Sequence, residues 1–190
     1  IHIHVDARKQ TAQSLRNLVN IMVAKEDLLF KALGVTPSRA MRWCKKAEPQ
    51  FITNINRFKP RTRNAIENLW YGERSSSYHS HYDNSRYHAL NLHSLWQGKG
   101  IEFRCFNGTT HAGKLKTYIQ LCLAICNQAM TQRGASARKT ETSNEKYTFR
   151  TWLLRMGMIG EEFDTARKFL LENLDGDIAF RNGRPDRAAA

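Results

Sequence analysis

The most informative segment of the chain is Gly100-Ile101-Glu102-Phe103-Arg104-Cys105-Phe106. Side chains alternate between the two faces of a β-strand, so Glu102 and Arg104 would share one face while the apolar residues share the other. This alternation predicts a strand with one side against a core. The charged side is consistent with an ordinary ion pair, which the spacing alone favours. It is also consistent with a site in which Glu102 holds Mg²⁺ and Arg104 binds phosphate.

The residues before this segment predict a second strand that pairs with it. Residues 87–95 alternate in polarity, and Gln97-Gly98-Lys99-Gly100 has the composition of a turn, so residues 87–106 predict a β-hairpin. Asn91 is unfavourable by propensity in the middle of a strand, which indicates a polar role. Arg86 stands where the strand begins and is a candidate for binding an anion.

A third strand is predicted at Ile1-His2-Ile3-His4-Val5-Asp6. The alternation places His2 and His4 on one face, where two imidazoles can hold a metal or flank a phosphate. Two polar residues on an exposed strand are the plainer interpretation. The segment reads as a strand already under way, without an initiator Met or a signal peptide, so we expect the chain to be a fragment of a longer protein.

Helical periodicity and capping residues recur along the rest of the chain. The predicted helices cover residues 11–33, 37–47, 61–70, 111–132, 145–157 and 161–173. In the helix at 111–132 the residues expected to face inward are Leu115, Tyr118, Ile119, Cys122, Leu123 and Cys126. Short strands interspersed with helices predict an α+β fold with an antiparallel sheet.

Composition excludes several classes of protein. The chain has 190 residues, a formal net charge of +13 and 41% hydrophobic residues, which is enough for a core and excludes wholesale disorder. No apolar run approaches the ~18 residues of a membrane span, which excludes a transmembrane protein. The four cysteines, with Cys122 and Cys126 one helical turn apart, favour free thiols in a cytoplasmic protein over a secreted disulfide framework.

The positive charge is densest between residues 39 and 63. The basic residues of this stretch are Arg39, Arg42, Lys45, Lys46, Arg57, Lys59, Arg61 and Arg63. Such a surface attracts polyanions, and Trp43, Phe51 and Phe58 could stack on bases, so a basic nucleic-acid-binding module is the alternative function. Helical spacing favours these aromatics as core residues, and a solvated basic face without a specific partner is equally open.

Three segments together resemble the putative amidoligase family, a branch of the carboxylate–amine ligase superfamily that contains glutamine synthetase and γ-glutamylcysteine synthetase. They are residues 2–6, 86–94 and 100–109, and residues 111–130 and 149–155 extend the resemblance. It implies a curved antiparallel sheet of the glutamine-synthetase-like catalytic fold with helices packed on its outer face. Residues 1–181 would then be the C-terminal larger part of the catalytic domain, and residues 182–190 a flexible tail.

The resemblance also implies an activity. Members of this superfamily use ATP and Mg²⁺ to convert a carboxylate into an acyl phosphate, which an amine then attacks to form an amide or peptide bond. The implied partners are therefore amine and carboxylate substrates, with peptides and proteins among them, rather than a membrane or nucleic acid. The oligomeric state is open.

The resemblance assigns a role to six residues of this chain. His2 and Glu102 would contact the metal, and His4 and Asn91 the nucleotide. Arg86 would bind phosphate during catalysis, and Arg104 would steady phosphate or the substrate carboxylate. One Glu and one His are an incomplete Mg²⁺ site, because Mg²⁺ prefers oxygen ligands. The family supplies further carboxylates from strands that precede the His-x-His strand, so the isolated chain is expected to have little activity. An inactive relative with an eroded site is a third interpretation, against which the joint presence of these residues argues.

Overall fold

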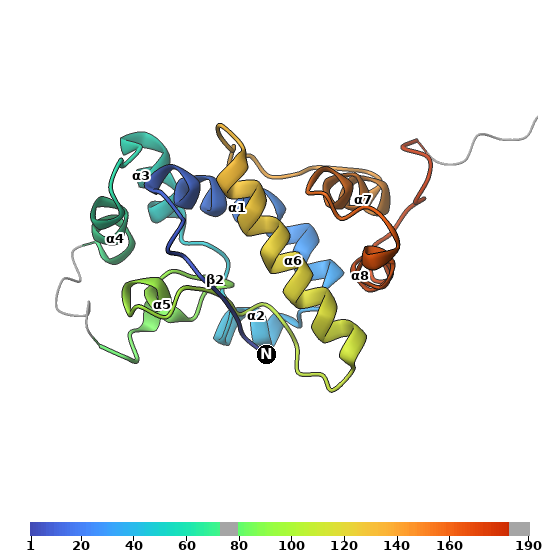
Figure 1. Ribbon diagram of the computed structural model, residues 1–190, viewed down its shortest axis with the longest axis horizontal. Coiled ribbons are helices and arrows are strands. Elements are labelled where there is room, and N and C mark those ends of the chain that lie inside the picture. Colours follow the sequence, from blue (N-terminus) through green and yellow to red (C-terminus); the bar gives the residue numbers. More distant parts are fainter. Residues whose placement is uncertain (73–79, 183–190) are drawn as a thin grey trace, which may run out of the picture.

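The computed structural model describes residues 1–72 and 80–182 (Figure 1). Two long helices, α1 (Ala12–Ala32) and α6 (Ala112–Thr131), pack side by side through the middle of the molecule. Helices α7 (Glu145–Arg155) and α8 (Asp164–Leu171) lie at one end, and α3 (Pro49–Phe58) and α4 (Arg63–Tyr71) at the other. The shorter elements are α2 (Pro37–Arg42), α5 (His93–Trp96) and the 3₁₀ turns η2 (Asn84–Arg86) and η3 (Glu161–Phe163).

A small antiparallel sheet has the strand order β1 (Ile3–Val5), β3 (Ile101–Phe103) and β2 (Leu90–Asn91). In this register His4 and Asn91 are the two cross-strand partners of Glu102. The α+β class and the antiparallel sheet are therefore confirmed. A glutamine-synthetase-like curvature stays a prediction, because three strands of two or three residues do not establish it.

The predicted strand at residues 87–95 is wrong in its second half. Strand β2 ends at Asn91, and helix α5 begins two residues later. The Asn91 side chain accepts a hydrogen bond from the backbone N–H of Ser94 at 3.4 Å, and Leu92 has right-handed helical angles. Asn side chains commonly start turns in this way, so the polar residue that weakens the strand also initiates the helix.

The predicted helices have counterparts in the structure, with two corrections. The predicted helix at 37–47 ends at Arg42, and Lys45 instead forms an isolated β-bridge opposite His88. The Lys45 N–H donates to the Tyr87 carbonyl, and its carbonyl accepts from the Ala89 N–H, both at 2.8 Å. Helix α3 is absent from the sequence prediction. The sequence does contain features typical of a helix here, since Pro49 occupies the first turn and the buried Phe51 and Ile55 are four residues apart.

The two central helices account for much of the core. Thr11 and Ser14 form the capping box that starts α1, since each side chain accepts a hydrogen bond from the backbone N–H of the other residue. In α6, Cys122 and Cys126 are buried as predicted. Ile119 and Leu123, predicted to face inward, are instead about half exposed, so the sequence prediction overestimated the buried face of α6.

Two further sequence predictions concern membrane-spanning helices and the C-terminal tail. Among the described residues, no helix is both long and apolar enough to cross a bilayer. The predicted tail at 182–190 falls almost wholly on residues 183–190, which lie outside the described part of the chain.

Candidate functional site

Glu102 is the centre of a group of polar side chains on the sheet. Its Oε1 lies 2.8 Å from His2 Nδ1 and 2.7 Å from Arg104 Nη1, and its Oε2 accepts a hydrogen bond from Asn91 Nδ2. His4 Nε2 is 3.7 Å from the same Oε1. The strand register explains this group: Arg104 is two residues along from Glu102 on one face, and the other residues approach from the neighbouring strands.

Glu102 is buried, and its neighbours determine its charge. Burial alone would raise the pKa of this carboxyl group. The His2 hydrogen bond, the Arg104 charge and the Asn91 hydrogen bond together outweigh burial and lower the pKa of Glu102 to about 2. Glu102 is therefore an anion at neutral pH, held by donors on three sides.

A cavity of about 240 Å³ lies over this group, and we call it the Glu102 cavity. It is lined by His2, His4, His81, Arg86, Asn91, His93, Ser94, Gln97, Lys99 and Glu102. Five of the six predicted site residues thus meet at one cavity, although they come from β1, the residue before it, η2, β2 and β3. Their roles stay predictions, but the structure brings them together.

Arg104 is the predicted residue that does not line this cavity. It is 4% exposed, and its guanidinium donates to Glu102 and to the backbone carbonyl of Trp43 at 3.3 Å. It also lies 5.6 Å from the centre of the Tyr87 ring. These contacts are those of a residue that positions Glu102. The predicted direct role of Arg104 on phosphate or on the substrate carboxylate stays a prediction.

Arg86 lines the cavity and retains donor capacity. Its Nη1 donates to the His81 carbonyl at 3.1 Å, and its guanidinium lies 5.5 Å and 5.7 Å from the Tyr82 and Tyr87 rings. Its Nε is buried without a hydrogen-bond partner among the described residues. A buried cationic N–H without a partner is costly, and an anionic ligand would satisfy it.

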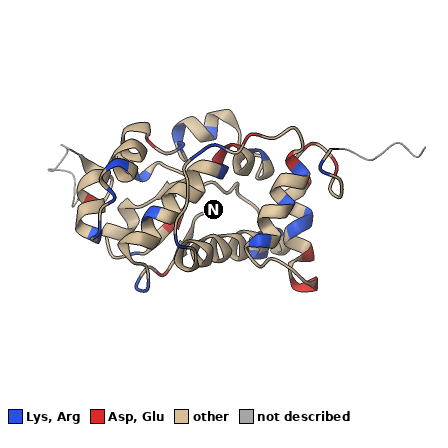
Figure 2. Cartoon of the chain, turned by 90° about the horizontal axis from the view of Figure 1, so that it is seen from above, with Lys and Arg blue, Asp and Glu red and all other residues tan. Residues whose placement is uncertain are grey.

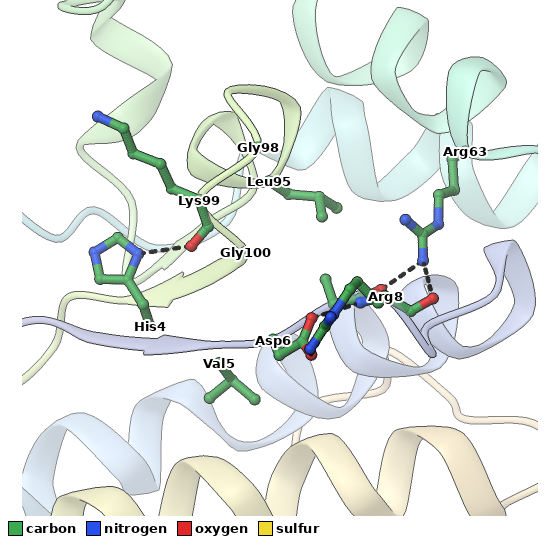
Figure 3. A pocket seen from close by; sticks show the side chains of 10 residues that line it. His4, Val5, Asp6, Arg8, Arg63, Leu95, Gly98, Lys99 and Gly100 are labelled. Carbon is green, nitrogen blue, oxygen red and sulfur yellow. Dashed lines mark hydrogen bonds and ion pairs between the residues drawn. The ribbon is translucent and has the colours of Figure 1, made fainter.

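A second cavity, of about 490 Å³, lies on the other side of His4 and is called the Arg63 cavity (Figure 3). Its lining includes His4, Lys99, Arg8, Arg63 and Gly100. His4 Nδ1 lies 3.2 Å from the Lys99 carbonyl oxygen, and these two residues belong to both cavities. The two spaces are therefore neighbours that share His4 and Lys99 in their linings.

His93 is a residue of the site to which the sequence interpretation assigned no role. It begins α5, is 2% exposed and lines the Glu102 cavity. Its Nδ1 forms a hydrogen bond with the Tyr71 hydroxyl, from the last turn of α4. Period-2 alternation placed His93 on a strand face, and only the unexpected helix α5 explains its position.

The basic stretch at residues 39–63 is partly committed to internal contacts. Arg39 donates to the carbonyls of Arg104 and Phe106, Arg63 to those of Ala7 and Gln10, and Lys46 pairs with Asp27. Elsewhere Lys and Arg are spread over several helices (Figure 2). The charge in this stretch therefore does not all remain available to an external partner.

The aromatic residues of this stretch divide between core and surface. Phe51 is buried, as the core interpretation predicted. That interpretation is wrong for Trp43 and Phe58, which are 45% and 59% exposed. Trp43 follows the end of α2, and Phe58 is the last residue of α3, so neither lies within the buried span of a helix.

The surroundings of Glu102 do not provide the ligands that Mg²⁺ requires. In the described part of the chain, no group of three or more His, Cys, Asp or Glu side chains is arranged to hold a metal ion. Both oxygens of Glu102 already accept hydrogen bonds from protein donors. Mg²⁺ demands a nearly octahedral set of oxygen ligands, so the described side chains do not fit this ion by themselves.

A family model described as "putative amidoligase enzyme" matches residues 1–126, which contain all six predicted site residues. Comparison with curated proteins and with solved structures gave no match. The match covers well over half of the chain and includes the whole sheet with both cavities. The chain therefore belongs to the amidoligase family.

Proposed function

We propose that this protein is an ATP-dependent carboxylate–amine ligase that forms an amide or peptide bond through an acyl phosphate. The observation that carries the proposal is the Glu102 cavity, where Arg86, Lys99 and four histidines surround a space beside a fixed carboxylate, within a member of the amidoligase family. Cationic donors of this kind are what phosphoryl transfer requires, because negative charge is spread over the phosphate oxygens in the transition state.

The residues of the cavity divide into two groups. Arg86 and Lys99 present cationic donors, and we assign them to the phosphates of ATP. Glu102 orients His2 through the 2.8 Å contact, and Arg104 and Asn91 hold Glu102 in turn. Such a supporting set keeps catalytic groups within a fraction of an ångström of one geometry, and this precision is a large part of catalysis.

The paired cavities support a reaction of more than one substrate. A ligase must hold a phosphoryl donor beside a carboxylate, and then an amine beside the acyl phosphate. We assign the phosphates to the Glu102 cavity and the carboxylate substrate to the Arg63 cavity, with His4 and Lys99 between them. ATP would enter as its Mg²⁺ complex. Since the described residues do not make a Mg²⁺ site, no step of this proposal depends on a protein–metal contact.

The test is a coupled assay for ADP release and a colorimetric assay for hydroxamate. The full-length protein that contains these residues receives ATP, Mg²⁺, hydroxylamine and a panel of amino acids and short peptides as carboxylates. We expect ADP release and hydroxamate formation that depend on one class of carboxylate. His4→Gln should reduce both, whereas His111→Asn should reduce neither, because His111 caps α6 and Asn is an equally good cap. If no carboxylate stimulates ADP release, the proposed function is wrong.

A further inference from the structure

His93 has an unusual environment for a buried imidazole. It is 2% exposed, its Nδ1 is bonded to the Tyr71 hydroxyl, and its Nε2 is buried with no hydrogen-bond partner in the described ranges 1–72 and 80–182. A buried polar atom without a partner costs free energy, which a hydrogen bond to a bound ligand would recover. The same side chain lines the Glu102 cavity, so a ligand there can reach it.

Resting on the function proposed above, we infer that His93 is a catalytic residue that accepts a proton from the amine substrate through Nε2. Amines bind as ammonium ions at neutral pH and cannot attack until a proton is removed. A histidine beside the reacting group is the commonest acceptor for this purpose. In the tautomer that can act as a base, Nδ1 carries the proton and donates to the Tyr71 oxygen, and the Nε2 lone pair accepts a proton. The backbone of Ser80, whose hydrogen bond to the ring raises the pKa of His93, then stabilises the imidazolium.

The electrostatic surroundings agree with a neutral acceptor. Burial lowers the pKa of His93, and Arg86 and His81 lower it further, while Asp83 and the backbone of Ser80 oppose the shift. The net direction is downward, so the imidazole is unprotonated at neutral pH and is available as a base.

The chemistry balances as two transfers. The substrate ammonium R′–NH₃⁺ gives one proton to Nε2, which produces R′–NH₂ and an imidazolium. The amine nitrogen then attacks the acyl carbon, and a C–N bond forms while the C–O bond to phosphate breaks, its electron pair leaving with the phosphate. The second proton lost by nitrogen leaves on that phosphate as hydrogen phosphate. The imidazolium releases its proton to solvent before the next turnover.

The experiment compares two nucleophiles in one enzyme. Hydroxylamine is largely unprotonated at neutral pH and needs no base, whereas an alkylamine needs one. In His93→Asn the amide occupies the position of Nδ1 and can keep the Tyr71 bond, but Nε2 is deleted. In His93→Gln the amide reaches the Nε2 position and cannot accept a proton. For both variants we expect amide formation to fall at least ~100-fold and hydroxamate formation to fall much less.

A pH series adds a second readout. The deficit of both variants with the alkylamine should shrink as pH rises, since more of the amine is then already unprotonated. Equal losses with both nucleophiles at every pH, or no loss with either, would overturn the role of His93. If both variants fail to fold, Tyr71→Phe replaces them, because it removes only the hydroxyl; it should also reduce amide formation more than hydroxamate formation.

The proposed function and the role of His93 can fail separately. A wild-type protein that forms neither hydroxamate nor amide refutes the ligase proposal itself. A wild-type protein that forms both, with His93 variants that do the same, refutes only the role of His93. His111→Asn is the control for replacing a histidine outside the cavity, and it should match the wild type with both nucleophiles.

Discussion

The Nδ1 atom of His2 lies 2.8 Å from Oε1 of Glu102, and the Nη1 atom of Arg104 lies 2.7 Å from the same oxygen. One carboxylate oxygen of β3 thus contacts both the residue that precedes β1 and the residue that follows β3. The ionised state of Glu102, the position of β1 and the shape of the cavity are consequently coupled. A change in any of these three should be measurable in the other two.

The first prediction concerns the charge of Glu102. Glu102→Gln leaves the Arg104 guanidinium buried without its counter-charge, so the free energy of unfolding should fall by about 3–5 kcal/mol. Urea denaturation followed by circular dichroism measures this change. Asp6→Asn is the control, because Asp6 pairs with Arg8 on an exposed surface and its loss should matter far less. Equal losses in the two variants would show that the buried pair is not stabilising.

The second prediction concerns pH. The pKa of Glu102 is about 2, below the ordinary value of 4.5, so its ionisation stabilises the fold above pH 4.5. This contribution, about 3 kcal/mol at ~1.4 kcal/mol per unit of pKa, should disappear as pH falls from 4.5 through 2. Urea denaturation at several pH values should show the loss in the wild type. In Glu102→Gln this part of the dependence of the free energy of unfolding on pH should be absent. The same dependence in the variant and the wild type would contradict the prediction.

The third prediction concerns the turn before β3. Gly100 has φ +82°, and a Cβ atom there would lie 2.5 Å from the Val5 carbonyl oxygen. Gly100→Ala should push β1 away from β3 and disturb the contacts of His4 and Glu102. Gly98→Ala is the matched control, since Gly98 has φ +73° but a Cβ atom there would meet no other atom within 4 Å.

The two glycine variants separate backbone strain from steric contact. Gly98→Ala should cost about 1 kcal/mol in the free energy of unfolding from the positive φ alone. Gly100→Ala should cost at least twice that and should also reduce ligase activity. Identical melting temperatures for the two variants would mean that the close approach to Val5 does not constrain the sheet.

The fourth prediction concerns the binding of phosphate. Arg86→Lys keeps the charge but removes the planar fork and the Nε donor, so KM for ATP should rise at least ~10-fold. Thermal stability should change little, since Arg86 donates to a single backbone carbonyl within the described structure. Arg42→Lys is the control, because Arg42 lies beside Trp43 outside both cavities. A similar KM in the two variants would remove Arg86 from the proposed site.

The fifth prediction addresses the alternative of a nucleic-acid-binding module. Because Arg39, Lys46 and Arg63 are committed to internal contacts, binding to single-stranded DNA should be weak at about 150 mM salt. A gel-shift titration from ~50 to ~200 mM salt measures the slope of log affinity against log salt. Tight binding that falls steeply with salt, and that Trp43→Ala or Phe58→Ala reduces, would favour the alternative over the proposed ligase.

Much of the architecture was predictable because it depends on local chemistry. Thr11 caps α1 and Gly34 follows its end with φ +61°, and both follow from side-chain and backbone preferences over a few residues. The alternation around Glu102 likewise required only the period of a strand. The shortened helix α2 and the shortened strand β2 depended instead on contacts that a local pattern does not contain, namely the Lys45–His88 bridge and the turn at Asn91.

The sequence by itself predicted which residues would form the site: the His2 and His4 pair, the Glu102 and Arg104 pair, Asn91 and Arg86. The tertiary structure decided how they divide, with Arg104 beneath Glu102 and the others around a cavity. It also decided the place of His93, which faces that cavity from a helix where a strand was expected. The physical reason is that alternation along a strand specifies only a face. Which atoms meet on that face depends on strand register and on helices distant in the sequence.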